Sequence, residues 1–188
     1  MKNGKLIVIA APSGSGKTSI VKSLISDESL NLGFSVSATS REKRENEING
    51  KDYYFLSQNQ FKEKINLNEF VEWEEVYKET FYGTLKSEID NLNSLGKNLI
   101  FDIDAIGGLS IKKEFPESTL ALFICPPSLK ELENRLRKRG TDSEEKIRIR
   151  LSKASKEMSM SVLYDYSIEN YNLEETVAKV KTLINNFL

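Results

Sequence analysis

The chain has 188 residues, of which 39% are apolar and 29% are charged, and its formal net charge at pH 7 is −1. This length suits one folding unit, and the composition is that of a globular rather than a disordered protein. The near-neutral charge argues against a general affinity for nucleic acid or anionic membranes. Because the chain has no histidine, histidine-dependent triads, histidine-ligated metals and imidazole acid–base catalysis are excluded.

Cysteine and targeting patterns predict a cytoplasmic location. The single cysteine, Cys125, lies in the apolar run LALFICPP, where we interpret it as a buried strand residue rather than a nucleophile. We find no pattern of a signal peptide and no apolar run of membrane-spanning length. Neither a membrane nor a nucleic acid is therefore expected as a partner.

Short apolar runs alternate with amphipathic stretches along the chain, which is typical of an α/β fold with a parallel sheet covered by helices. The expected strands are residues 5–11, 98–104 and 119–125. The expected helices are residues 18–26, 128–139, 143 to about 163, and 172–188. Asn172 and Glu175 form the pattern of a capping box for the last helix.

The segment of residues 33–83 breaks this alternation. Its runs GFSVSAT, DYYFLS and EFVEWEEVY have the composition of strands. Between them, SQNQFKEKINL is predicted as a short helix capped by Ser57 and Gln60. We expect a mostly β insertion that binds a ligand. A second interruption, RGTDSEE at residues 139–145, is expected to be a polar turn between two helices.

The stretch APSGSGKT follows the first expected strand and opens a helix. It matches the phosphate-loop motif GxxxxGK[ST], except that Ala11 replaces the first glycine and requires a negative φ there. Gly14 and Gly16 allow backbone N–H groups to converge on a polyphosphate at a helix N-terminus. We expect Lys17 to reach the β and γ phosphates and Thr18 to ligate Mg²⁺. The alternative is a glycine turn with an incidental lysine.

A carboxylate near the metal is expected at the end of a neighbouring strand. Asp102 ends the apolar run NLIFD and suits a role as a magnesium-water ligand or catalytic carboxylate. Asp104 would point to the same face if the backbone stays extended; a pair of turn-forming aspartates is the alternative. GTPases, ATPase motors and small kinases share this loop, so these residues alone do not define the reaction.

A basic and aromatic run in the β insertion suggests a second phosphate site. Arg41 and Arg44 precede Tyr53 in TSREKRENEINGKDYYF, and guanidinium groups bind phosphate bidentately. A solvated run of mixed charge is the alternative.

The same insertion contains groups suited to a guanine base. One ionised carboxylate accepts from both N1–H and N2–H of guanine, whereas adenine would leave it unpaired. Glu72 and Asp104 are candidates for this carboxylate, with Ser37 and Thr84 as hydroxyl partners.

These motifs, in this order, resemble the guanylate kinase family from end to end. The family signature is fitted at Thr39, Arg41, Arg44, Glu47, Gly50, Tyr53 and Phe55. It is accompanied by APSGSGKT, GFSVSAT, EFVEWEEVY, YGT, DIDAIGG and RKRGTDSEE. The chain departs from the family at Ala11, and at Ile106, where many members have glutamine and to which we assign no role.

The resemblance implies a P-loop NTPase-type α/β fold and an enzyme that transfers the γ-phosphoryl group of ATP to GMP or dGMP, with Mg²⁺, in purine nucleotide metabolism. It implies a single domain over residues 1–188, as a monomer or small homo-oligomer. The expected parts are a core (residues 1–35, 85–134 and 152–188), a GMP-binding insertion (about 36–84) and a lid (about 135–151).

The resemblance also implies roles for individual residues. The ATP-binding residues would be Ala11, Pro12, Ser13, Gly14, Ser15, Gly16, Lys17, Thr18, Arg135, Arg139 and, near the adenine, Asn170. The GMP-binding residues would be Ser37, Arg41, Arg44, Tyr53, Glu72, Tyr82, Thr84, Asp104 and Arg150. The catalytic residues would be Lys17, Arg41, Asp102, Arg139 and Arg150, with Thr18 and Asp102 at the metal, the latter through water. Arg137 and Lys138 are expected to be solvated.

Two other functions fit parts of this pattern. One is a kinase for another nucleoside monophosphate. The other is a guanylate-kinase-like scaffold module that binds proteins and has lost catalysis. Such a module does not need the phosphate-loop and lid residues that this chain keeps, which are Lys17, Thr18, Asp102, Arg139 and Arg150.

Overall fold

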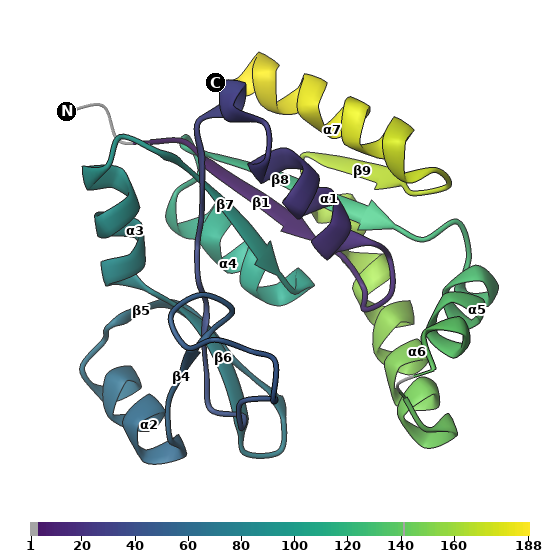
Figure 1. The fold of residues 1–188 in the computed structure, drawn as a ribbon, viewed down its shortest axis with the longest axis horizontal. Coiled ribbons are helices and arrows are strands. Elements are labelled where there is room, and N and C mark those ends of the chain that lie inside the picture. Colours follow the sequence, from purple (N-terminus) through teal and green to yellow (C-terminus); the bar gives the residue numbers. More distant parts are fainter. Residues whose placement is uncertain (1–3, 141) are drawn as a thin grey trace.

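The computed structural model describes residues 4–140 and 142–188. Within them, five parallel strands form one sheet in the order β2-β7-β1-β8-β9 (Figure 1). The strands are β1 (Leu6–Ala10), β2 (Leu32–Phe34), β7 (Asn98–Ile103), β8 (Thr119–Cys125) and β9 (Tyr166–Glu169). The expected parallel α/β fold is confirmed, and the three strands predicted from apolar runs form its centre.

Helices cover both faces of this sheet. They are α1 (Lys17–Ile25), α3 (Lys86–Ser94), α4 (Ala105–Glu114), α5 (Leu129–Arg139), α6 (Glu144–Ser159) and α7 (Leu173–Phe187), with short 3-10 helices η1 (Glu28–Leu30) and η2 (Met160–Leu163). Helices α1 and α7 lie on one face and α3 and α4 on the other, while α5 and α6 extend away from the sheet (Figure 1).

Alternating side chains of β1 explain this two-sided cover. Ile7 and Ile9 belong to the apolar cluster of α1 and α7, whereas Val8 and Ala10 belong to the cluster of α3 and α4. All five residues of β1 are buried, which is typical of a central parallel strand. The sheet is thus fixed from both faces, and its carboxyl edge is a rigid base for the loops that follow β1 and β7.

A second, four-stranded sheet with the order β4-β3-β6-β5 forms within the described residues. Its strands are β3 (Ala38–Thr39), β4 (Tyr54–Phe55), β5 (Phe70–Tyr77) and β6 (Thr80–Leu85), and helix α2 (Gln58–Asn66) packs on it. Phe61 of α2 stacks on Phe70 with ring centroids 4.4 Å apart. The expected β insertion therefore has a small apolar core of its own.

Some element predictions were wrong. The run GFSVSAT is two strands rather than one, because Leu32–Phe34 pairs with β7 in the first sheet and Ala38–Thr39 pairs with β4 and β6 in the second. The expected helix from residue 143 to about 163 changes to a 3-10 helix at Met160. Helices α3 and α4 and strands β6 and β9 were missed.

Local capping patterns were confirmed. Ser57 and Gln60 form a reciprocal capping box on α2. Asn172 accepts from the backbone N–H groups of Glu174 and Glu175, which is its half of the predicted box. The polar turn separates α5 from α6, with Gly140 and Ser143 as their caps. None of the helices in the described ranges is long and apolar enough to cross a membrane.

Candidate active site

The phosphate loop connects β1 to α1 at the carboxyl edge of the parallel sheet. Gly14 and Gly16 have φ angles of 96° and 93°, in the left-handed region that favours glycine. Gly16 is also the N-cap of α1, so the loop leads directly into a helix N-terminus. Ala11 is buried without a positive φ, and replacement of the first glycine is therefore tolerated. This backbone is suited to binding a polyphosphate.

The carboxylate of Asp102 contacts both Lys17 and Thr18, the first two residues of α1. The Lys17 Nζ lies 2.9 Å from Asp102 Oδ1 and also donates to the carbonyl oxygen of Ile103. Thr18 Oγ1 donates to Asp102 Oδ2 at 3.0 Å. The parallel register of β1 and β7 pairs Ile9 with Asp102, which brings the carboxylate beside the loop. A hydroxyl and a carboxylate this close are hard oxygen donors of the kind that Mg²⁺ prefers alongside water and phosphate.

Asn170 supports the phosphate loop from beneath. Its side chain is buried, its Nδ2 donates to the Ser15 carbonyl oxygen at 2.7 Å, and its Oδ1 accepts from Thr176 Oγ1 at 3.0 Å. A Cβ atom added at Gly16 would lie 2.6 Å from Asn170 Nδ2, so the second glycine also makes room for this contact. Both ends of the amide are engaged by the protein, and this structural role, like that of Thr176, was not found from the sequence.

Arginines of the lid segment reach the same region. Arg150 on α6 donates to Ser13 Oγ at 2.5 Å, and its Nε lies 3.2 Å from Asp142 Oδ2. Arg135 on α5 donates to the Asn170 carbonyl oxygen at 3.0 Å. Arg139 is exposed at the end of α5. Arg137 is exposed and pairs with Glu133 and Glu144, in agreement with its predicted position on a solvated face.

The second predicted anion site is organised around Arg41. Both oxygens of Glu47 accept from its guanidinium group, at 2.7 and 2.5 Å. The guanidinium carbon lies 5.0 Å from the ring centroid of Tyr53 and 5.4 Å from that of Phe55. The hydrogen bond to Arg41 lowers the pKa of Glu47 to about 2 and raises that of Arg41. Glu47 fits the family signature, but its bidentate contact with Arg41 was not predicted from the sequence.

Tyr82 and Arg44 complete the surroundings of Arg41. The ring of Tyr82 packs edge-on against Tyr53, with centroids 5.9 Å apart. Arg44 is exposed and contributes its backbone N–H, which donates to Glu47 at 2.9 Å. Burial raises the pKa of Tyr53, and the charges of Tyr82 and Asp102 raise it further. Arg41, Glu47, Tyr53, Phe55 and Tyr82 thus form one cluster, the Arg41 cluster, in the β insertion.

Glu72 is a buried carboxylate beside these sites. It is 8% exposed and lies opposite Thr84 in the β5–β6 register. Burial raises the pKa of Glu72 to about 7, and the charge of Asp104 adds to this shift. A Cβ atom at Gly107 would lie 2.8 Å from Glu72 Oε2, so the carboxylate of Glu72 lies against the backbone at the start of α4 and would have to shift if this glycine were replaced. Ser37 is half-buried at the entrance to the second sheet.

Asp104 has a different set of partners from Asp102. It keeps an extended backbone and caps α4, accepting from the N–H groups of Ile106 and Gly107 at 3.1 and 2.9 Å. Burial opposes its ionisation, but hydrogen bonds from Glu74 and Gly107 lower its pKa below the usual value. Burial and the neighbouring Asp104 raise the pKa of Glu74. Sequence reasoning missed Glu74, although it follows Glu72 by two positions on the same face of β5.

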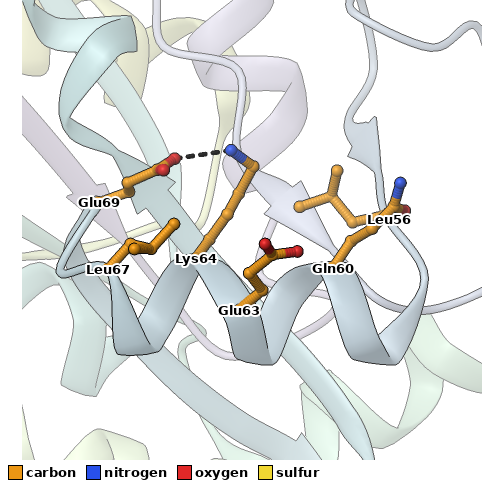
Figure 2. Close-up of a pocket in the computed structure, with 6 residues that line it drawn as sticks. All are labelled: Leu56, Gln60, Glu63, Lys64, Leu67 and Glu69. Carbon is orange, nitrogen blue, oxygen red and sulfur yellow. Dashed lines mark hydrogen bonds and ion pairs between the residues drawn. The ribbon is translucent and has the colours of Figure 1, made fainter.

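A hollow elsewhere on the molecule is separate from these residues. It has a volume of about 250 Å³ and lies along α2 (Figure 2). Its lining residues are Leu56, Gln60, Glu63, Lys64, Leu67 and Glu69. Lys64 is neutralised by Glu69 at 2.6 Å, and none of the lining residues is a predicted site residue.

The loop, the carboxylate at the end of the neighbouring strand and the parallel strand order define a P-loop nucleotide-binding protein. The β insertion adds a second basic cluster around Arg41 and a buried carboxylate, Glu72, and a second site of this kind suits two nucleotide substrates rather than one.

Comparisons with known proteins give the particular family. The guanylate kinase family model matches residues 3–187. A guanylate kinase of Porphyromonas gingivalis is 50% identical over 184 residues, which cover 98% of each chain. One of Bacteroides thetaiotaomicron is 46% identical over 185 residues, 98% of this chain and 90% of that one. A crystal structure of guanylate kinase from Anaplasma phagocytophilum has a TM-score of 0.78 and 29% identity, over 97% of this chain and 85% of that one. The chain belongs to the guanylate kinase family.

Proposed function

We propose that the protein transfers the γ-phosphoryl group of ATP to GMP, giving GDP and ADP, and also to dGMP, giving dGDP and ADP, in purine nucleotide metabolism. The observation that carries this proposal is that the chain holds a phosphate loop with Lys17 beside Asp102 and, in the β insertion, a separate Arg41 cluster and the buried carboxylate of Glu72. Family membership supports the same reaction.

In this proposal each nucleotide has its own set of residues. ATP is bound by the loop residues Ala11, Pro12, Ser13, Gly14, Ser15, Gly16, Lys17 and Thr18, with Arg135, Arg139 and Asn170. GMP is bound by Ser37, Arg41, Arg44, Tyr53, Glu72, Tyr82, Thr84, Asp104 and Arg150. We further propose that residues 36–84 form the GMP-binding part and residues 135–151 the lid, on a core of residues 1–35, 85–134 and 152–188. Oligomeric state and cytoplasmic location stay predictions.

The contacts of Asn170 define its part in ATP binding more narrowly than the sequence did. Its side chain is already engaged by Ser15 and Thr176. The side-chain amide of Asn170 therefore holds the phosphate loop. In this proposal the adenine lies near the backbone of Asn170 rather than against its side chain.

Phosphoryl transfer between two phosphates brings many negative oxygens together, so catalysis consists mainly of positioning and charge neutralisation. Lys17 and Arg41 supply fixed positive charge from the two sides, and Arg139 and Arg150 add charge from the lid. The phosphate of GMP is already an anionic nucleophile, and no general base is needed. Thr18 and Asp102 would hold Mg²⁺, which supplies neutralisation of the β and γ phosphates when bound. Closure of the lid over the two nucleotides would exclude water from the reacting phosphates.

Base selection follows from Glu72. When ionised, its carboxylate accepts from two adjacent donors of guanine, and a base without them would leave a buried charge unpaired. Thr84 Oγ1 is fully buried and makes no hydrogen bond of good geometry among the described residues, but it lies close enough to Glu72 to lower the pKa of that carboxyl, so both groups can turn to a bound base.

A coupled assay of ADP release against GMP, dGMP, AMP, dTMP and UMP tests the proposed function. GMP should exceed AMP, dTMP and UMP in kcat/KM by about 10²-fold or more, since rejecting an unpaired buried polar group is worth several powers of ten. Comparable activity with AMP or a pyrimidine nucleotide would show that Glu72 does not select the base.

A further inference from the structure

Glu88 is a buried carboxylate to which none of the roles above is assigned. It lies in the first turn of α3, directly after the second sheet ends at Leu85, and its residue is only 6% exposed. No ion pair to Glu88 is found within the described residues. Burying a carboxylate without a cation costs free energy unless hydrogen bonds and a helix N-terminus compensate. Its partners therefore indicate what the carboxylate does.

The two oxygens of Glu88 bind two different segments that lead into the second sheet. Oε1 accepts from the backbone N–H of Val36 at 3.0 Å, and Oε2 accepts from the hydroxyl of Tyr54 at 2.9 Å. These segments are also joined directly, because the Tyr54 N–H donates to the Ser37 carbonyl oxygen at 2.9 Å. One side chain on α3 thus holds both the segment between β2 and β3 and the strand β4 against this helix.

The residues next to these contacts belong to the proposed GMP site. Ser37 follows Val36, while Tyr53 and Phe55 flank Tyr54 on the opposite face of the strand. Tyr53 and Phe55 contact the Arg41 guanidinium group, whereas Tyr54 packs in the small core of the second sheet. A displacement of Tyr54 would therefore move the two rings that hold Arg41, and a displacement of Val36 would move Ser37.

We infer that Glu88 is a positioning residue for GMP: its carboxylate fixes Val36 and Tyr54, and through them holds Ser37, Tyr53 and Arg41 in the geometry that binds the acceptor nucleotide. This inference rests on the proposed function, because it uses the assignment of Arg41 and Tyr53 to GMP. The phosphate loop makes no contact with Glu88 among those described, so the effect is confined to one substrate.

Steady-state kinetics of Glu88→Ala, Glu88→Gln and Tyr54→Phe test the inference. Glu88→Ala removes both contacts and should raise the KM for GMP about tenfold, with the KM for ATP within about twofold of wild type. Glu88→Gln should restore most of the GMP affinity, because its carbonyl oxygen accepts from Val36 and its NH₂ group donates to the Tyr54 oxygen. Tyr54→Phe removes one hydroxyl and should raise the KM for GMP in the same direction by a smaller factor.

Leu92→Ala is the matched control for stability. Leu92 lies on the same helix and packs against the apolar cluster of α3 and α4, without belonging to the proposed site. It should lower the melting temperature while leaving both KM values within about twofold of wild type. If Glu88→Ala does not fold, Tyr54→Phe decides the question, because it removes a single hydroxyl group and keeps the ring that packs in the second sheet's core.

Three results would overturn the inference: an unchanged KM for GMP in Glu88→Ala or, if that variant does not fold, in Tyr54→Phe; an equal rise in the KM for ATP; or an equal effect of Leu92→Ala. Arg41→Ala separates this failure from that of the proposed function. If Arg41→Ala weakens GMP and Glu88→Ala does not, only the inference is wrong; if Arg41→Ala leaves GMP binding unchanged, the site assignment itself is wrong.

Discussion

The ammonium group of Lys17 lies 2.9 Å from the carboxylate of Asp102, on the strand next to the phosphate loop. The side chain that should meet the triphosphate is therefore held beside the carboxylate that should meet the metal. This pairing fixes the long lysine side chain in one region and reduces the ordering needed when a nucleotide binds.

Lys17→Ala should lower kcat by at least about 10²-fold, because one preorganised contact to the developing charge is lost. Single-turnover measurements of γ-phosphoryl transfer at saturating ATP and GMP would give this value. Lys22→Ala, on the exposed side of the same helix, serves as a control with unchanged turnover. Near-normal kcat in Lys17→Ala would contradict the assignment of the loop.

Arg41→Ala should weaken GMP binding by about 1.5 to 3 kcal/mol, the usual value of a hydrogen bond to a charged group. Isothermal titration calorimetry with GMP and, separately, with a non-hydrolysable ATP analogue measures both affinities. ATP affinity should be nearly unchanged, and so should both affinities in the exposed control Lys51→Ala. Equal weakening of the two nucleotides would contradict a two-site arrangement.

GMP affinity should fall as the pH is lowered through 7. Burial raises the pKa of Glu72 to about 7, and the ionised form is the one that accepts from guanine, so protonation competes with binding. Between pH 8 and pH 6 the dissociation constant should rise roughly tenfold from this group alone. Glu72→Gln should bind GMP more weakly and lose this component of the pH dependence.

Glu74→Gln distinguishes Glu72 from its neighbour, because the pKa of Glu74 is raised as well. In this variant the pH dependence assigned to Glu72 should remain. Lys153 Nζ lies 3.9 Å from Asp104 Oδ2 and 3.6 Å from Glu157 Oε1. Its positive charge therefore stays beside Asp104 in both the Glu72 and the Glu74 variant. If Glu74→Gln alone abolished the effect, the titrating group would be Glu74.

Asn170→Ala should lower the free energy of unfolding by about 1 to 3 kcal/mol, because the carbonyl of Ser15 and the hydroxyl of Thr176 lose a buried partner. ATP should bind more weakly, while GMP affinity in the absence of ATP should change little. Urea unfolding and nucleotide titrations measure these effects. Asn186→Ala, exposed on α7, is the control. Unchanged stability and ATP affinity would contradict a supporting role for Asn170.

Much of the fold could be predicted because its central strands are long apolar runs and the phosphate loop has a strict spacing. The split of GFSVSAT could not, since alternation does not say which of two sheets a strand joins. Helix α4 was missed because AIGGLSIKKE contains two glycines, which are unfavourable in helices. There Gly108 leaves room for the Tyr164 hydroxyl, to which an added Cβ atom would lie 2.6 Å away, so tertiary packing outweighs helix propensity.

Charged residues of the site were predictable where a motif fixed their spacing, as for Lys17 and Arg41. Glu88 had no such signal: in LKSEID it has the pattern of an exposed helix residue, and only the folded chain brings Val36 and Tyr54 to it. The contact of the Asn170 side chain with Ser15 was likewise not predictable, because the two residues are 155 positions apart in the sequence. The resemblance placed this asparagine near the adenine instead.

Gly107 has no side chain and leaves space for the carboxylate of Glu72, to which the proposed function assigns the choice of base. Since a Cβ atom there would lie 2.8 Å from Glu72 Oε2, Gly107→Ala should shift that carboxylate without removing any polar group. A change in the preference for nucleobases could therefore be sought first by substitution of Gly107, before any polar side chain of the site is replaced.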